Sequence, residues 1–292
     1  MSESVSLVIP VYNEKTGIAP MLKRLLAVAP QLGPEGEIIV VEDGSTDGAR
    51  ELLKQLATDF PPNFRLVLHD RNRGYGRALK TGVKAARNEM IAIADADGTY
   101  PMERIGEFAE AMRTEGAAMV VGARPVSQQP AVRRPAKAVL KVFAEYLTGQ
   151  RIPDLNSGFR IFRRADVARH QNLLPDGFSF TTTITMALLT EGERVVFIPI
   201  RYRKRIGNSK IRPIRDTANF LMLTCRTALA FNPLKVFGPA GLALIAAGCG
   251  FLAARFILNK QFGVATTVTL LVGGVQVLAM GLLADLINRR GR

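Results

Sequence analysis

The sequence predicts an α/β fold in which a mainly parallel β-sheet domain precedes an interfacial helix and two membrane-spanning helices. Residues 5–231 alternate between runs of Val, Ile and Leu and segments with helix-spaced apolar residues. Unbroken apolar strands separated by single helices are typical of parallel sheets whose two faces are both covered. Beyond this region lie two long apolar segments. We therefore expect a sheet domain over 1–215, an interfacial helix over 216–233 and a membrane part over 234–292.

The expected strands and helices of the sheet domain follow one another along its first half. Each strand is a short run of apolar residues, and each helix has apolar residues at helical spacing. Strands are predicted at 5–13, 37–45, 64–70, 90–97 and 117–125, and helices at 17–32, 46–60 and 74–87. We expect Ser45 or Thr46 to cap the second helix, because a hydroxyl accepts a hydrogen bond from a free N–H group at a helix start.

After Tyr100 the pattern changes. The runs 159–167 and 194–205 resemble strands of a mixed sheet edge. Residues 216–232 form an amphipathic helical pattern directly before the first long apolar segment, which suits a membrane interface.

The two apolar segments predict a membrane hairpin. The expected spans are about 236–258, which contains the single charge Arg255, and about 262–287. Each is long enough, as a helix, to cross ~30 Å of hydrocarbon. The short linker between them forces the two helices to run antiparallel. Two buried core helices are the alternative, although core helices rarely stay apolar all round for this length.

The chain is strongly basic, with a net charge of +14 and a pI of about 10.3. This predicts an anionic partner such as a phosphorylated substrate, an anionic membrane surface or nucleic acid. Residues 201–215 contain seven basic and no acidic residues, and the chain ends in NRRGR. Basic flanks mark the cytoplasmic side, so we expect a multi-pass inner (plasma) membrane protein with its sheet domain in the cytoplasm. No zinc-finger or aromatic-interleaved basic motif is present, so no nucleic-acid partner is expected.

Two carboxylates, Asp95 and Asp97, follow the fourth predicted strand in the run IAIADADGTYP. A buried carboxylate is costly unless it is paired or bound to a cation. Ligands bind at the carboxyl ends of the strands in such sheets, where Asp43 is also expected. Mg²⁺ and Mn²⁺ take a few carboxylates together with substrate phosphate oxygens. The pattern therefore indicates a Mg²⁺ or Mn²⁺ site for a diphosphate, with a solvated, helix-capping turn as the alternative.

Two common nucleotide motifs are absent. The run RGYGRALKTG contains Gly-x-Gly, but no Gly-x-Gly-x-x-Gly follows the first strand, and there is no Walker lysine motif. This argues against a dinucleotide site and against a P-loop.

Seven motifs resemble, in their order along the chain, those of family 2 glycosyltransferases of the GT-A fold. They are IPVYNE, VVEDGSTDG, RNRGYGRALKTGVKAA, ADADGTYP, VGAR, SGFRIFRR and RIGNSK. The resemblance covers residues 5 to about 215 and is narrowest to the polyprenyl-phosphate glycosyltransferases, the group of dolichyl-phosphate mannose synthase and the bacterial undecaprenyl-phosphate glucosyltransferases. It implies a Rossmann-like GT-A domain and inverting transfer of a hexose from a UDP- or GDP-sugar to polyprenyl phosphate, for cell-envelope glycan or glycolipid modification. A homo-oligomer is compatible with this reading.

The resemblance also implies roles for individual residues. Asp95 and Asp97 would bind the metal, and Asp97, Arg124 and Arg205 would act in catalysis. The basic stretch from 133 to 137 would hold the lipid phosphate. The nucleotide-binding residues would be Pro10, Tyr12, Glu14, Val41, Asp43, Asp95, Ala96 and Lys210, and the lipid-phosphate ligands Arg133, Arg134 and Lys137. The mannose synthases usually carry an apolar residue and Gln after the second Asp, where this chain has Gly98 and Thr99, so the third metal ligand stays open.

Several of these assignments have a structural alternative. Glu14 and Asp43 can each serve a helix start, residues 133–137 can be a solvated basic run, and residues 201–210 can be membrane-facing charge. Two other functions compete as well. A glycan-extending family 2 synthase usually carries Q-x-x-R-W, and this chain has no Trp. A non-catalytic membrane partner is disfavoured by the intact Asp and Arg motifs.

Overall fold

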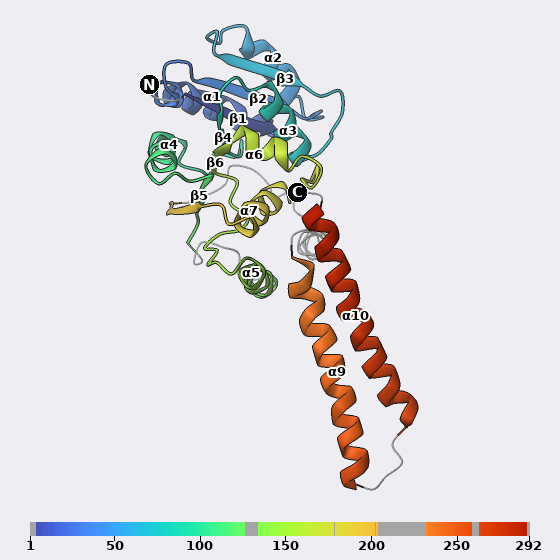
Figure 1. Ribbon diagram of the computed structural model, residues 1–292. Helices are drawn as coiled ribbons and strands as arrows, with labels where there is room; N and C mark the ends of the chain where they lie inside the picture. Colours follow the sequence, from blue (N-terminus) through green and yellow to red (C-terminus); the bar gives the residue numbers. More distant parts are fainter. Residues whose placement is uncertain are drawn as a thin grey trace. The chain divides into compact units, whose positions relative to one another are not determined.

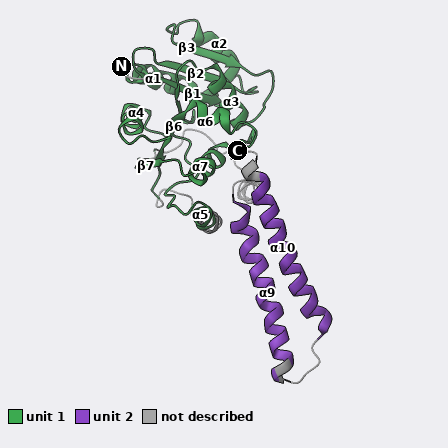
Figure 2. Cartoon of the chain, in the orientation of Figure 1, with its two compact units in different colours: residues 1–221 green, residues 222–292 purple. Residues whose placement is uncertain are grey.

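The computed structural model describes residues 4–125, 134–177, 179–201, 203, 232–258 and 263–290. For residues 134–140, 256, 258 and 288–290 it describes the backbone alone. The chain divides into two compact units, residues 1–221 and 222–292 (Figure 2). The first contains the sheet and the second contains the two long apolar helices.

A seven-stranded sheet lies at the centre of the first unit (Figure 1). Its strands, in the order in which they lie side by side, are β3 (Phe64–Leu68), β2 (Glu37–Glu42), β1 (Val5–Val11), β4 (Met90–Ile93), β6 (Arg160–Arg163), β5 (Met119–Ala123) and β7 (Val195–Pro199). All neighbouring pairs are parallel except the two that involve β6. The predicted mainly parallel sheet is therefore confirmed.

The prediction that the later strands form a mixed edge is wrong for β6. This strand lies inside the sheet, antiparallel to both β4 and β5, and of the two later strands β7 alone lies at an edge. Its residues Arg160, Ile161 and Phe162 are at most 1% exposed, as an interior position requires. The expected strand over 159–167 is also shorter, because Arg164–Arg169 forms helix α6, which buries Val167.

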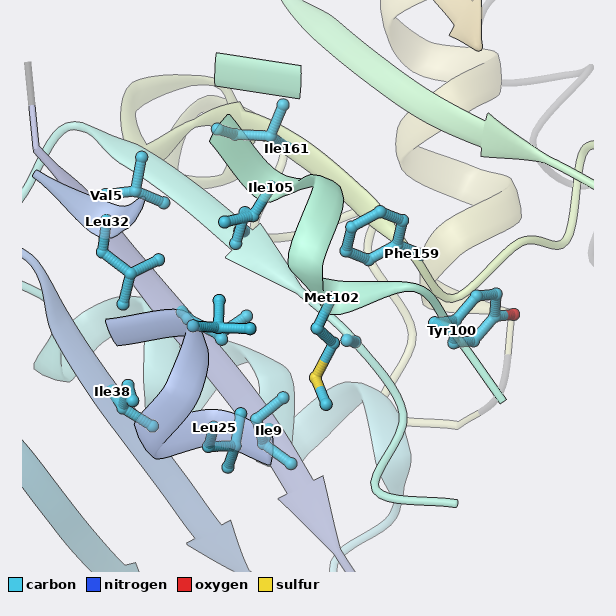
Figure 3. Packing of buried hydrophobic residues seen from close by; sticks show 14 of the residues in the cluster. Val5, Ile9, Leu25, Leu32, Ile38, Tyr100, Met102, Ile105, Phe159 and Ile161 are labelled. Carbon is cyan, nitrogen blue, oxygen red and sulfur yellow. The ribbon is translucent and has the colours of Figure 1, made fainter. Parts of the chain in front are cut away.

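Helices cover both faces of the sheet and give each face its own apolar core. The helices of the first unit are α1 (Lys15–Val28), α2 (Ala49–Ala57), α3 (Tyr75–Ala85), α4 (Ile105–Thr114), α5 (Arg134–Thr148), α6 (Arg164–Arg169) and α7 (Phe180–Thr190), with 3-10 turns at Ala29–Leu32 and Met102–Arg104. One core combines residues of α1, α2 and α4 with alternate strand residues (Figure 3). The other combines residues of α3, α6 and α7 with the remaining strand residues. Buried strands of this kind are why unbroken apolar runs predicted a parallel sheet.

The expected cap of the second helix is wrong. Helix α2 begins at Ala49 after Gly48, and the Ala49 N–H group donates to Asp47 Oδ1 at 2.9 Å. Ser45 and Thr46 instead contact the loop after β1. The Asn13 N–H group donates to Ser45 Oγ at 2.9 Å, and the Thr46 N–H group donates to Asn13 Oδ1 at 2.7 Å. The hydroxyl and amide groups are therefore used to join two strand ends rather than to start a helix.

The strand register brings the predicted polar residues to one edge of the sheet. Val11 of β1 pairs with Glu42 of β2, and Val8 of β1 pairs with Ile93 of β4. The three strands are parallel, so the residues that follow them lie along the same edge of the sheet, the one formed by the carboxyl ends of the strands. This is the edge at which ligands bind in parallel sheets.

The second unit is a hairpin of α9 (Pro233–Leu258) and α10 (Val264–Arg290), which lie side by side (Figure 1). A Cβ atom on Gly241 would lie 2.9 Å from the Gly274 carbonyl oxygen, and one on Gly274 would lie 2.8 Å from the Gly241 carbonyl oxygen. Glycine is required at this crossing because the two backbones touch there. Phe237 packs at Gly281, near the opposite end of α10 from its start, so the helices run antiparallel as predicted.

Both helices are long and apolar enough to cross a membrane. The segments Pro233–Arg255 and Val264–Ile287 have mean hydropathies of 1.9 and 2.1, and only 11% of each is buried within the protein. Core helices of a soluble protein would be mostly buried, so the alternative of two core helices does not fit. Nearly all of the expected interfacial helix at 216–233 lies outside the described residues.

Candidate active site

The loop that carries Asp95 and Asp97 is held by its own turn and by α1. Asp97 is 5% exposed, and its Oδ1 accepts hydrogen bonds from the Thr99 N–H group at 3.1 Å and from Thr99 Oγ1 at 2.6 Å. Arg24 of α1 donates to the carbonyl oxygens of Gly98 and Tyr100, both at 2.7 Å. Thr99 therefore uses its hydroxyl to orient Asp97.

Asp95 is oriented from two sides. The Tyr75 hydroxyl, at the start of α3, donates to Asp95 Oδ1 at 2.8 Å. Burial, followed by the proximity of Asp95, raises the pKa of Tyr75 well above its usual value, so the phenol remains a proton donor. On the other side, a Cβ atom on Gly158 would lie 2.6 Å from Asp95 Oδ2 and 2.7 Å from Oδ1. Only glycine allows the loop before β6 to approach this carboxylate.

The same loop carries a buried ion pair with Arg124. Arg124 Nε donates to Asp154 Oδ2 at 2.6 Å, and Nη2 donates to Oδ1 at 3.0 Å. Burial by itself would raise the pKa of Asp154, but the hydrogen bonds and charge of Arg124 outweigh it, and the pKa is lowered below its usual value. Asp154 is therefore an anion at neutral pH, and it orients the guanidinium of Arg124.

Arg160 fastens this loop to α7. Its side chain is 1% exposed, and it donates to the Ser157 carbonyl oxygen at 3.1 Å through Nε and to the Thr181 carbonyl oxygen at 2.8 Å through Nη1. Burial lowers the pKa of Arg160 to about 10, so it is still a cation at neutral pH. Gly158, which follows Ser157, donates its N–H group to the Tyr100 hydroxyl at 2.8 Å. The loop is thus anchored on both sides of the point at which it meets Asp95.

Asp43 connects the end of β2 to the start of α3. It is 2% exposed and accepts hydrogen bonds from the N–H groups of Arg73 and Gly74, both at 2.9 Å. His69 Nδ1 lies 2.7 Å from Asp43 Oδ1. Asp43 therefore does not cap α2, the helix that follows it in the sequence, and instead holds the loop that leads into α3. His69, to which the sequence assigned no role, is a partner of this carboxylate.

Four more residues expected at the nucleotide, which are Pro10, Tyr12, Glu14 and Val41, lie at or near the carboxyl ends of β1 and β2. Pro10 of β1 pairs in register with Val41 of β2. Val41 is fully buried, and its side chain belongs to the core on the α3 side. Tyr12 follows β1 directly, and Glu14 is the residue before α1, where it makes no side-chain capping hydrogen bond. Asn13 between them has a φ of 50°, a left-handed conformation that Asn tolerates well.

The donor atoms at Asp95 and Asp97 fit a small divalent cation. Within the described part of the chain, no group of three or more His, Cys, Asp or Glu side chains gathers as a metal site. The oxygens of Asp43 instead accept hydrogen bonds from the N–H groups of the β3–α3 loop. Mg²⁺ is typically held by one or two carboxylates with substrate phosphates, so two aspartates are a sufficient protein contribution.

Five expected residues cannot be placed by their side chains. Arg133, Arg205 and Lys210 lie outside the described residues, and so do the side chains of Arg134 and Lys137 in α5. Arg203 is the described residue closest to Arg205 in the sequence. Its N–H group donates to the Thr99 carbonyl oxygen at 2.9 Å, so the chain reaches the site at that residue.

Sequence reasoning missed several residues of this site. Tyr75 and Gly158 lie within motifs that were recognised, RGYG and SGFR, but nothing local indicated that both meet Asp95. Arg160 lies in the same SGFR motif but was given no role, and Asp154 was not singled out at all. A carboxylate in a loop or an arginine at the start of a strand is ordinary in sequence, and only its partners distinguish it.

Residues 6–170 match the family described as Glycosyl transferase family 2, and residues 232–289 match the family described as the GtrB C-terminal hairpin. The chain belongs to the family 2 glycosyltransferases. The first match covers more than half of the chain and contains β2 to β6 and both aspartates. The second covers α9 and α10. This glycosyltransferase therefore combines a GT-A domain with a membrane hairpin, as its motifs and its apolar C-terminal segments predicted.

Curated relatives confirm the narrower resemblance to polyprenyl-phosphate glycosyltransferases. The glycosyltransferase is 30% identical to the undecaprenyl-phosphate 4-deoxy-4-formamido-L-arabinose transferase of Pseudomonas fluorescens, over 98% of its own length and 84% of the relative's. It is 29% identical to the transferase of the same description from Pectobacterium carotovorum, over 98% and 89% of the two chains.

Solved structures share the fold of the first unit. Glucosyl-3-phosphoglycerate synthase from Mycobacterium tuberculosis, in complex with Mn²⁺, UDP and glucosyl-3-phosphoglycerate, has a TM-score of 0.57 with 17% sequence identity. The match covers 77% of this chain and 80% of that one. The same synthase in complex with Mg²⁺ and UDP has a TM-score of 0.56 with 17% identity, over 77% and 79% of the two chains. At such identities the likeness shows the GT-A fold alone.

Proposed function

We propose that this glycosyltransferase transfers a sugar from a UDP- or GDP-sugar to a polyprenyl phosphate, with inversion at the anomeric carbon. The observation that carries the proposal is the pair Asp95 and Asp97 at the end of β4, each oriented by a hydroxyl donor, in a chain that also contains a membrane hairpin. The first feature suits a nucleoside diphosphate, and the second suits an acceptor that lies in a membrane.

The metal part of the proposal rests on the chemistry of the two carboxylates. Asp95 and Asp97 would hold Mg²⁺ or Mn²⁺, and similar solved structures contain Mn²⁺ or Mg²⁺ with UDP. When bound, the cation would neutralise the diphosphate and stabilise it as a leaving group. Asp43 and the residues after β1 would hold the base and ribose. Arg124, oriented by Asp154, would neutralise phosphate charge, and Arg205 and Lys210 would close over the diphosphate.

The acceptor needs little activation. A phosphate monoester has a second pKa of roughly 6 and is mostly a dianion at neutral pH. Its oxygen can attack the anomeric carbon from the face opposite the leaving nucleotide without a dedicated base. The protein then has to supply positioning and charge neutralisation, which agrees with a site rich in Arg and carboxylates. Relatives named as undecaprenyl-phosphate transferases support this acceptor.

Two sugar classes are candidates. The motifs of the sequence suggest a hexose, whereas the names of the relatives specify 4-deoxy-4-formamido-L-arabinose. The test is to incubate membranes that contain the protein and undecaprenyl phosphate with one radiolabelled donor at a time. The donors are UDP-glucose and GDP-mannose for the hexose, and UDP-4-deoxy-4-formamido-L-arabinose for the other sugar class. Label from one donor is expected in the organic-solvent extract as a sugar that mild acid releases. Label in a polymer, or in no product with any donor, would contradict the proposal.

A double substitution tests the proposed lipid-phosphate contact. Arg133→Ala/Arg134→Ala is expected to raise the KM for polyprenyl phosphate about ten- to hundredfold, because the loss of a charge-assisted contact to the phosphate costs on the order of 1.5–3 kcal/mol in total. Donor binding, measured by calorimetry, should stay nearly unchanged, whereas Arg205→Ala should weaken donor binding first. The exposed pair Lys23 and Lys54 provides a matched control for charge. Equal loss of donor and acceptor binding would place the Arg pair elsewhere.

We further propose that both chain ends and the sheet domain face the cytoplasm of the inner membrane. The basic residues that flank the two helices favour this orientation. In a variant with Cys225 and Cys249 replaced by Ser, a membrane-impermeant thiol reagent applied to intact cells should label a cysteine introduced at Asn259. It should not label a cysteine at Arg292. Labelling only of the cysteine at Arg292 would indicate the opposite orientation and contradict the proposal.

A further inference from the structure

Tyr75 makes the hydrogen bond that fixes one oxygen of Asp95. The phenol donates to Asp95 Oδ1 at 2.8 Å, and Gly158 closes the other side of the same carboxylate. Rotation of the carboxylate away from this orientation would break the bond to Tyr75 or bring its oxygens closer to the loop at Gly158. The Tyr75 hydroxyl therefore holds Asp95 in the orientation in which it faces the site.

The backbone around Tyr75 is immobilised by two close approaches. A Cβ atom on Gly74 would lie 2.6 Å from the Asp176 carbonyl oxygen, and one on Gly76 would lie 2.2 Å from the Pro175 carbonyl oxygen. Arg77 donates its N–H group to the Asp176 carbonyl oxygen at 3.1 Å. The two glycines of the RGYG run thus allow the loop at 175–177 to pack against the start of α3.

A hydrogen-bonded chain that begins at the buried Asp43 holds the same backbone as well. Asp43 accepts bonds from the N–H groups of Arg73 and Gly74, at 2.9 Å each. His69 bridges Asp43, at 2.7 Å, and Thr81 Oγ1, at 2.9 Å. Asp43 directly follows β2, His69 directly follows β3, and Thr81 lies in α3. The chain therefore links the packing of these three elements to the residue that precedes Tyr75.

We propose that Tyr75 is a positioning residue that presents Asp95 to the divalent cation in one orientation, and that the Asp43–His69–Thr81 chain acts on the cation through Tyr75. This inference rests on the proposed metal-dependent binding of a nucleoside diphosphate. Partners that orient a metal ligand from behind typically change metal affinity by about ten- to hundredfold when they are removed. Tyr75→Phe removes the donor and keeps the ring.

The test measures Mn²⁺ and nucleotide binding by the full-length protein in detergent. Free Mn²⁺ is followed by electron paramagnetic resonance, and calorimetry with UDP and GDP is repeated over a series of Mn²⁺ concentrations. Tyr75→Phe is expected to raise the Mn²⁺ concentration for half-maximal nucleotide binding about tenfold. Thr81→Val should shift it in the same direction by less. Tyr146→Phe, at a side chain 50% exposed on α5, is the matched control and should leave it unchanged.

The outcomes separate this inference from the proposed function. If the wild-type protein binds neither nucleotide in a Mn²⁺-dependent manner, the proposed function fails, whatever Tyr75→Phe does. If the wild type is Mn²⁺-dependent and Tyr75→Phe has the same Mn²⁺ requirement, the role of Tyr75 is overturned. If Tyr75→Phe melts at a lower temperature and its weak nucleotide binding is not restored by saturating Mn²⁺, the Tyr75 hydroxyl has a purely structural role. This result would also overturn the inference. If Tyr75→Phe does not fold, an unchanged Mn²⁺ requirement in Thr81→Val decides against the inference.

Discussion

Replacing Asp97 by Asn is expected to lower the initial rate of sugar transfer on the order of a thousandfold. Asp97 is buried, and its Oδ1 accepts both hydrogen bonds from Thr99. An Asn side chain can accept the same two bonds, so the turn should survive while the negative charge is lost. Without that charge the cation site loses an anionic ligand. A bound cation stabilises the charge of the transition state by several kcal/mol, and this stabilisation would be lost with it. The measurement is the initial rate over a range of Mn²⁺ concentrations.

Asp59→Asn provides the control for this experiment, because Asp59 is an exposed carboxylate outside the site. It should transfer sugar at the wild-type rate. Both variants should melt at the wild-type temperature, which separates loss of the charge from loss of the fold. A wild-type rate in Asp97→Asn, or full wild-type activity in excess chelator, would remove the metal from the proposed mechanism.

Replacing Gly158 by Ala is expected to lower kcat/KM for the donor about a hundredfold. The new Cβ atom would lie 2.6–2.8 Å from Oδ2, Oδ1 and Cγ of Asp95, which is closer than real Cβ contacts allow. The loop cannot retreat easily, because the Gly158 N–H group is bonded to Tyr100 and the Ser157 carbonyl oxygen is bonded to the buried Arg160. Asp95 therefore has to move, and a displacement of about 1 Å at a reacting centre can cost a factor of about a hundred.

Gly106→Ala is the matched control for Gly158→Ala. Gly106 lies in α4, and a Cβ atom there would meet no heavy atom within 4 Å. This substitution should keep full activity and stabilise the fold by about 0.4–1 kcal/mol, since alanine has less conformational freedom to lose in a helix. Wild-type kcat/KM and Mn²⁺ dependence in Gly158→Ala would show that the orientation of Asp95 does not matter for transfer.

Local patterns in the sequence were enough to predict the parallel part of the sheet. Strands β1, β2 and β4 are apolar on both faces because helices cover both faces, and this condition is visible in each strand alone. The sequence also located Asp95 and Asp97, because carboxylates that directly follow a buried strand are informative without knowledge of their neighbours. The hairpin of α9 and α10 was predictable for the same reason, since its signal is a long run of apolar residues.

The position of β6 and the partners of the acidic residues were decided by the tertiary structure. An apolar run specifies burial but not which strands lie beside it, so β6 was expected at an edge and lies between β4 and β5. Tyr75 is 20 residues from Asp95 in the sequence, and Asp154 is 30 residues from Arg124. Periodicity and spacing describe neighbours along the chain, whereas these contacts form when separate strand ends meet at one edge of the sheet. The sequence by itself therefore determined which residues carry charge at that edge, and only the folded chain decided which donor, cation or glycine orients each of them.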